Sequence, residues 1–96
     1  MNSSVAVLGI DVAKLKFDVC LINRSGKLKH KIFANMAAGF HQLAAWLTKQ
    51  GAQRVHACME ATGAYGEALA LHLHAAGHTV SVVNPADMLP DLNTSR

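Results

Sequence analysis

Two carboxylates at the ends of apolar segments are the residues best suited to chemistry in this sequence. Asp11 follows an apolar run at residues 5–10, and Glu60 follows a mostly apolar run at residues 54–59. An acid at the rim of a buried strand is costly unless it meets a cation, a metal ion or hydrogen-bond donors. If the two strands are parallel neighbours, repulsion between the carboxylates favours protonation of one or binding of Mg²⁺ or Mn²⁺. The pattern therefore indicates a divalent-metal site, with caps, turn residues and salt bridges as the alternative roles.

Three further residues near these acids are candidates for contact with nucleic-acid phosphates. Lys14 and Lys16 come soon after Asp11 and can reach phosphates, which predicts salt-dependent binding. Solvated lysines in a hairpin are an equally good explanation. Thr62, with Gly63, can present backbone N–H groups to a phosphate at the start of a helix, although capping of that helix needs the same residue types.

The composition is that of one small globular domain with a modest positive charge. The chain has 96 residues, of which 51% are hydrophobic and 16% charged, and its formal net charge is +3. A chain of this length holds one core, and the apolar content excludes a charge-rich disordered chain. Residues 1–31 carry six cationic and two acidic side chains, whereas the remainder sums to −1. This asymmetry is compatible with a polyanionic partner, and a solvated lysine-rich face is the simpler explanation.

Membrane and redox functions have no support in the sequence. No apolar run approaches the ~18 residues that a spanning helix needs, and residues 5–10 lack the length and the preceding positive charge of a signal peptide. We therefore expect a cytoplasmic protein without membrane contact. Cys20 and Cys58 belong to no CxxC pair, and both are predicted to be buried free thiols.

Hydrophobic periodicity predicts seven elements in the order strand, strand, strand, helix, strand, helix, strand. The predicted strands cover residues 5–10, 16–23, 28–34, 54–59 and 79–83, and the predicted helices cover residues 36–50 and 65–76. The first strand is apolar at every position, as expected of a central strand covered on both faces. The third alternates lysines with apolar residues, which is typical of an outer strand whose edge is protected by charge.

These elements predict an α/β fold with a mixed sheet. Three strands in an antiparallel meander are followed by right-handed helical crossovers, which can place the fourth strand parallel beside the first. The ends of those two strands then become neighbours. Asp11 and Glu60 are therefore expected at one edge of the sheet.

Four motifs follow one another along about residues 5–85. They are VLGIDVAK at residues 7–14, NMAAGF at 35–40, CMEATGAYG at 58–66 and AGHTVSVVNP at 76–85. Together they resemble the opening of insertion-sequence transposases that carry an RuvC-like DEDD domain, and the first and third motifs, in this order and spacing, are quite specific.

The resemblance implies an RNase H-like (RuvC-like) fold with magnesium held by four acids. It implies cleavage and joining of DNA strands during transposition of an insertion element, guided by a structured RNA that the element encodes. Asp11 matches the first acid of the family and Glu60 the second. Two metal ions about 4 Å apart activate the attacking oxygen and stabilise the leaving oxygen in such nucleases, and two carboxylates rarely hold both.

The sequence departs from the family pattern after residue 85. Family members continue through a basic helical segment to a motif that carries the last two acids, and Asp87 and Asp91 do not match that motif. We therefore expect residues 1–85 to form a partial RNase H-like domain, incomplete at its C-terminal end, and residues 86–96 to form an irregular tail. Strand-transfer activity of the chain alone is not expected.

Two other functions fit the same strand order. One is an actin-like ATP-binding domain, which usually has a Gly/Thr-rich turn after the first strand, where this chain has Val12, Ala13, Lys14 and Leu15. The other is a non-catalytic assembly or regulatory module, because an incomplete sheet leaves an edge that can pair with a partner or form a homo-oligomer.

Overall fold

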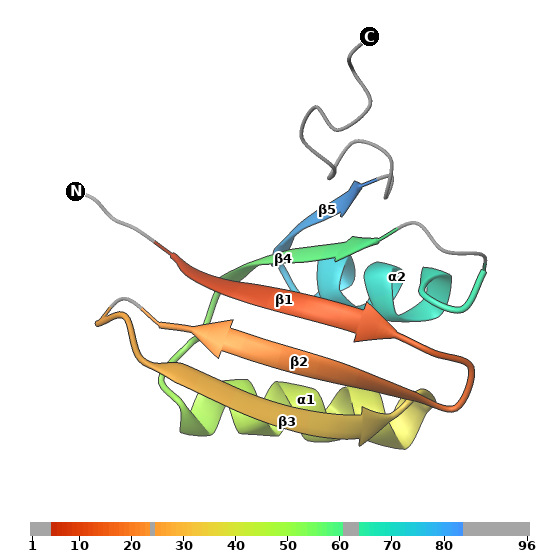
Figure 1. Cartoon of the computed structure of the whole chain (residues 1–96), viewed down its shortest axis with the longest axis horizontal. Helices are drawn as coiled ribbons and strands as arrows, with labels where there is room; N and C mark the ends of the chain where they lie inside the picture. The colour runs from red at the N-terminus through yellow and green to blue at the C-terminus, as the bar shows by residue number, and fades with distance from the viewer. Residues whose placement is uncertain (1–4, 24, 61–63, 84–96) are drawn as a thin grey trace, which may run out of the picture.

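The structure is a computed structural model that describes residues 5–23, 25–60 and 64–83 (Figure 1). The predicted order of elements is confirmed. The strands are β1 (Ala6–Val12), β2 (Lys16–Ile22), β3 (Leu28–Ala34), β4 (Val55–Glu60) and β5 (Thr79–Val83), and the helices are α1 (Ala37–Lys49) and α2 (Glu67–Ala75). Thr62 and the predicted tail at residues 86–96 lie outside the described residues, as does the proposed boundary at residue 85.

The five strands form one mixed sheet in the order β3-β2-β1-β4-β5. The meander β1-β2-β3 is antiparallel, whereas β4 lies parallel beside β1 and β5 parallel beside β4. This is the RNase H-like arrangement, and it confirms the predicted neighbourhood of the first and fourth strands. Strand β3 forms the outer edge of the sheet, as its alternating lysines predicted.

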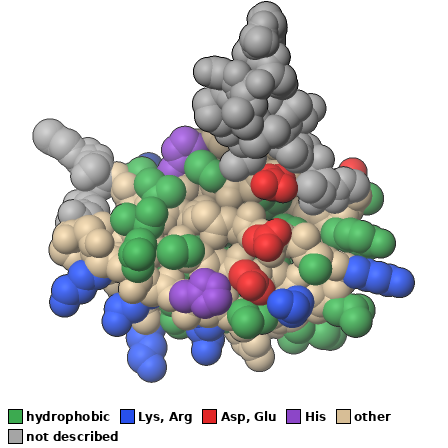
Figure 2. Space-filling view, viewed as in Figure 1, with side chains coloured by type: hydrophobic (Ala, Val, Ile, Leu, Met, Phe, Trp, Pro, Cys, Tyr) green, Lys and Arg blue, Asp and Glu red, His purple; other side chains and the backbone are tan. Residues whose placement is uncertain are grey.

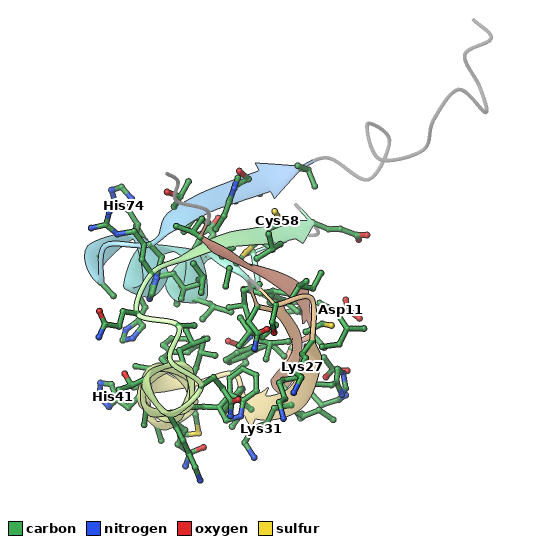
Figure 3. The ribbon with its side chains drawn as sticks, turned by 90° about the vertical axis from the view of Figure 1, so that its left-hand side faces the viewer. Asp11, Lys27, Lys31, His41, Cys58 and His74 are labelled. Carbon is green, nitrogen blue, oxygen red and sulfur yellow. The ribbon has the colours of Figure 1, made fainter. Side chains whose placement is uncertain are left out.

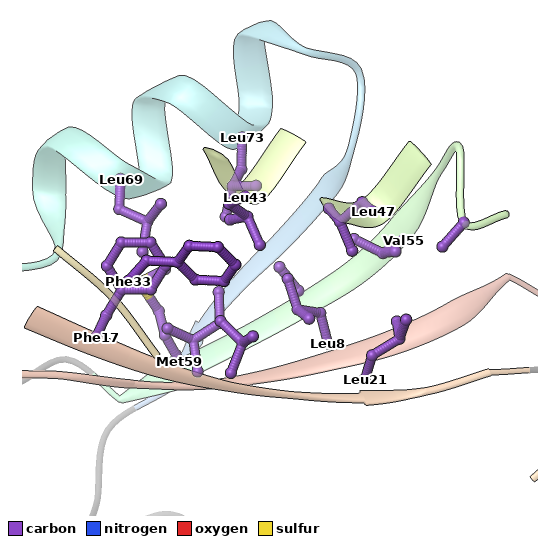
Figure 4. Close-up of a cluster of buried hydrophobic side chains, with 14 of the residues drawn as sticks. Leu8, Phe17, Leu21, Phe33, Leu43, Leu47, Val55, Met59, Leu69 and Leu73 are labelled. Carbon is purple, nitrogen blue, oxygen red and sulfur yellow. The ribbon is translucent and has the colours of Figure 1, made fainter. Parts of the chain in front are cut away.

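Both helices pack on the same face of the sheet (Figures 1 and 4). The crossover from β3 to β4 through α1 and the crossover from β4 to β5 through α2 move in the same direction across the sheet, so right-handed connections place both helices on one side. The expectation that β1 is covered on both faces is therefore wrong for the described residues. Leu8 is fully buried beneath the helices, but its neighbour Val7 points to the other face and is 38% exposed.

The core consists of apolar side chains between the sheet and the helices. Every second residue of a strand points toward the helices and contributes to it. No polar or charged residue among the described ones is buried. An aromatic cluster lies within this core. Phe17 stacks on Phe33 with ring centroids 5.5 Å apart, and Trp46 packs edge-on against Phe33 with ring centroids 5.9 Å apart. The largest fully buried side chains are Phe17, Leu8, Leu21, Leu43, Leu47, Leu69, Leu73, Val19 and Val55 (Figure 4).

Helix α1 approaches β3 closely because residue 39 has no side chain. A Cβ atom at Gly39 would overlap the backbone carbonyl of Ala34. The chain turns from β3 into α1 through Met36, whose extended backbone precedes the first helical residue. Glycine at this position therefore sets the distance between the helix and the edge strand.

A histidine side chain links β5 to β4, the two strands at the opposite edge of the sheet from β3. His78 precedes β5, and its Nδ1 atom accepts a hydrogen bond of 3.1 Å from the backbone N–H of Val55. Burial lowers the pKa of His78 below its ordinary value of 6.5, and the positive charge of Arg54 and the nearby His72 lower it further. The neutral ring is thus the form that the folded chain favours.

The two helices are short. In the part of the chain that the structure describes, neither is long and apolar enough to cross a membrane.

Candidate metal centre on the open face of the sheet

Neither helix of the described part of the chain covers the second face of the sheet (Figure 1), which we call the open face. Its side chains form three rows. Strand register defines the rows, because directly paired residues point to the same side. Running from β3 to β5, they are an apolar row (Leu28, Ile22, Val7, His56, Thr79), a middle row (His30, Cys20, Gly9, Cys58, Ser81) and an acidic row (Ile32, Asp18, Asp11, Glu60, Val83).

The acidic row brings together the two acids that the sequence predicted. Ile10 pairs with Met59 in the parallel ladder between β1 and β4, so the next positions, Asp11 and Glu60, lie at the same level on adjacent strands. Both side chains are exposed. They border an open depression of about 510 Å³ on this face, and Figure 2 shows acidic side chains gathered there.

A third carboxylate, which sequence reasoning missed as a site residue, completes the row. Asp18 in β2 is the direct antiparallel partner of Asp11 and lines the same depression. The signal was present in the sequence: a meander folded at residues 13–15 pairs position 11 with position 18. Asp18 is half-buried and forms an ion pair of 3.3 Å with Lys16, so one predicted phosphate-binding lysine is held at the rim of the depression.

The carboxylates of the acidic row are the kind of ligand that a hard divalent cation prefers, but the described ones are too few to complete a metal site. Carboxylate oxygens are the ligands that Mg²⁺ prefers, usually one or two from the protein with the rest from water and substrate. Within residues 5–23, 25–60 and 64–83, no group of three or more potential ligands is close enough together to hold a metal ion. The described acids therefore offer part of a metal site.

Comparison with known proteins identifies the chain. The family model described as "Transposase", for DEDD transposases of the IS110 type, matches residues 8–91. The chain belongs to this transposase family. This membership agrees with the resemblance of the sequence motifs and with the RNase H-like strand order, and it covers both Asp11 and Glu60.

Curated relatives of this transposase chain carry names that refer to DNA rearrangement. The pilin gene-inverting protein of Moraxella lacunata is 38% identical over 84 residues, and that of Moraxella bovis is 37% identical over 84 residues. Each match covers 85% of this chain and 26% of the relative, so the chain spans about a quarter of their length. Among solved structures, a Ppx/GppA family protein of Aquifex aeolicus aligns with a TM-score of 0.49 and 13% identity, covering 86% of this chain and 36% of that one.

Asn35 positions the loops that follow both acids, and sequence reasoning gave it no role beyond the second motif of the transposase family. Its side-chain amide donates hydrogen bonds to the carbonyl oxygens of Ala13, at 2.9 Å, and Tyr65, at 3.0 Å. Its backbone N–H donates to the carbonyl of Leu15 at 2.9 Å. One residue at the end of β3 thus links the turn after Asp11 to the segment that leads from β4 into α2. Only tertiary contact reveals this link, because the partners are 22 and 30 positions away.

The remaining predicted residues have mixed outcomes. Lys14 is exposed in the turn after β1, where a partner can reach it. Cys20 and Cys58 were expected to be buried, and this is wrong: both are half-exposed on the open face. They lie on either side of Gly9 in the middle row. They are therefore about two strand spacings, roughly 10 Å, apart, which is too far for a disulfide.

Proposed function

We propose that this chain supplies two metal-binding acids, Asp11 and Glu60, of a DNA transposase that cuts and joins DNA strands during movement of an insertion element. The observation that carries the proposal is the placement of these carboxylates at the same level of adjacent parallel strands, on the face without helices. Family membership supports the reaction class. Because the chain spans 26% of the length of its curated relatives, we expect the other acids of a four-acid set elsewhere in the complete protein.

The chain's own residues have distinct tasks in this proposal. Asp11 and Glu60 would hold Mg²⁺ or Mn²⁺, and the paired strands that carry them keep the two carboxylates at the same level of the sheet. A cation bound there would assist the attacking oxygen and stabilise the leaving oxygen. Asp18 tethers Lys16 at 3.3 Å, which orients this ammonium group toward a phosphate that enters the acidic row.

DNA is the proposed partner of this surface. The two curated relatives are named for the inversion of a pilin gene, and we extend rearrangement of DNA segments to this chain. Lys14 and Lys16 are the proposed phosphate contacts, and Thr62 stays a prediction of the same kind. Guidance by a structured RNA and homo-oligomer formation also remain predictions.

A manganese titration followed by NMR tests the metal-binding step. Mn²⁺ broadens the resonances of nearby nuclei, so in the isotope-labelled chain we expect selective broadening around residues 11, 18 and 60. Asp11→Asn and Glu60→Gln should each weaken this broadening strongly, because each removes one of the few charged ligands. Glu67→Gln is the matched control, since Glu67 is an exposed acid in the first turn of α2.

The proposal fails if the unmodified chain shows no selective broadening, or if the two carboxylate variants behave like the Glu67→Gln control. Asp18→Asn separates two roles of the third acid. Loss of broadening would make Asp18 a ligand. Unchanged broadening with weaker salt-dependent DNA binding would assign it to the positioning of Lys16.

A further inference from the structure

A pair of histidines on the helix side of the molecule forms a second candidate metal site, unrelated to the acidic row. His41 in α1 and His72 in α2 have ring centroids 5.8 Å apart, with an angle of 55° between the rings. Asp11 and His41 lie on opposite sides of the molecule (Figure 3). The two sites therefore cannot share ligands.

The distance between the rings suits a shared cation. Two imidazole nitrogens on one zinc ion lie at most ~4 Å apart, because each Zn–N bond is about 2.0–2.1 Å long. Ring centroids 5.8 Å apart allow the nitrogens to reach this separation by side-chain rotation. His41 is exposed and His72 is half-buried, so water and ions can reach the pair.

Both rings are available for coordination. Among the hydrogen bonds and ion pairs of the described residues, none involves His41 or His72, in contrast to His56, which bonds Ser81 at 2.6 Å. The ring of Phe40 lies 5.4 Å from that of His72. This contact limits the directions that His72 can take and leaves its approach to His41 in place.

We propose that His41 and His72 bind a borderline divalent transition-metal ion, such as Zn²⁺, Ni²⁺ or Cu²⁺, with water in the remaining positions. Imidazole nitrogen suits these cations, whereas Mg²⁺ prefers oxygen ligands and belongs to the acidic row. A cation held by both residues connects α1 to α2. Binding to the folded state alone would then stabilise the chain by mass action.

A zinc titration tests the site at a pH where the imidazoles are neutral. We expect Zn²⁺ to shift the ring resonances of His41 and His72 together and to raise the midpoint of thermal unfolding, with reversal by a chelator. His41→Ala and His72→Ala should each weaken the affinity for zinc by at least ~10–100-fold. Loss of a group that only supports a metal ligand typically has this effect, and here the ligand itself is removed. His74→Ala is the matched control, because His74 (Figure 3) is an exposed histidine of the same helix, two positions after His72.

Three results would overturn the proposal. Zinc binding unchanged in both His41→Ala and His72→Ala would assign the ion elsewhere, for example to the thiols of the middle row. A loss in only one of these variants would show a single ligand and no bridge between the helices. An equal loss in His74→Ala would show non-specific binding to surface imidazoles.

Discussion

The two faces of this sheet are built from alternate residues of the same strands, yet all the carboxylates of the strands lie on one of them. The helix side collects the fully buried apolar side chains, such as Leu8 and Phe17, and no buried polar group is found there among the described residues. On the open face, acids, two thiols and the imidazole of His30 line a depression. Because neighbouring positions of a strand point to opposite sides, the same strands contribute buried core residues to one face and the candidate acidic ligands to the other.

The largest expected difference between the faces is in the free energy of unfolding. Leu8→Ala should destabilise the chain by ~2–5 kcal/mol, because it leaves a cavity under the helices. The adjacent change Val7→Ala, on the open face, should stay within about 0.5–1 kcal/mol, since its side chain is already 38% exposed. Urea unfolding followed by circular dichroism measures both. Equal losses would mean that the open face is as tightly packed as the core.

A pair of glycine substitutions sharpens the same comparison at intermediate size. Gly39→Ala should cost ~1–3 kcal/mol, because the added methyl group overlaps the backbone of Ala34 and α1 must move. Gly9→Ala on the open face should be nearly neutral, since the nearest atom to its Cβ would be the carbonyl oxygen of Cys20 at 3.9 Å. Thermal unfolding of both variants tests this. A neutral Gly39→Ala would show that the helix position adapts freely.

The smallest expected effect is on the pH dependence of the free energy of unfolding, and it comes from His78. Because the folded-state pKa of His78 is lowered from 6.5, its contribution to stability is fully present above 6.5. It is lost as the pH falls from there through the lowered pKa, since the unfolded chain binds the proton first. His78→Gln should flatten this part of the profile, measured by urea unfolding at a series of pH values. His74→Gln should retain it, and a profile unchanged by His78→Gln would contradict the assignment.

Much of the fold was predictable because local patterns are strong here. Strand β5 and strand β3 have the predicted bounds. The place of Glu60 beside Asp11 also followed from the order of elements and the handedness of crossovers. Metal binding by these two residues remains a prediction.

Other features of the candidate site were not predictable from local pattern. The apolar run of β1 suggested burial on both faces, but apolar content does not say how many layers cover a strand. The place of Asp18 in the site was not predicted, because it depends on the register of an antiparallel strand pair, and register is a property of two segments. Asn35 was missed for a similar reason, as its partners Ala13 and Tyr65 are distant in sequence.

The sequence by itself determined the kinds and order of the elements and the rim positions of two acids, because hydrophobic period and turn residues act over a few positions. Only the tertiary structure decided that the described helices cover a single face, that Asp18 joins the acidic row, and that the rings of His41 and His72 lie side by side. These outcomes depend on crossover direction, strand register and helix placement, which are set by contacts between segments far apart along the chain.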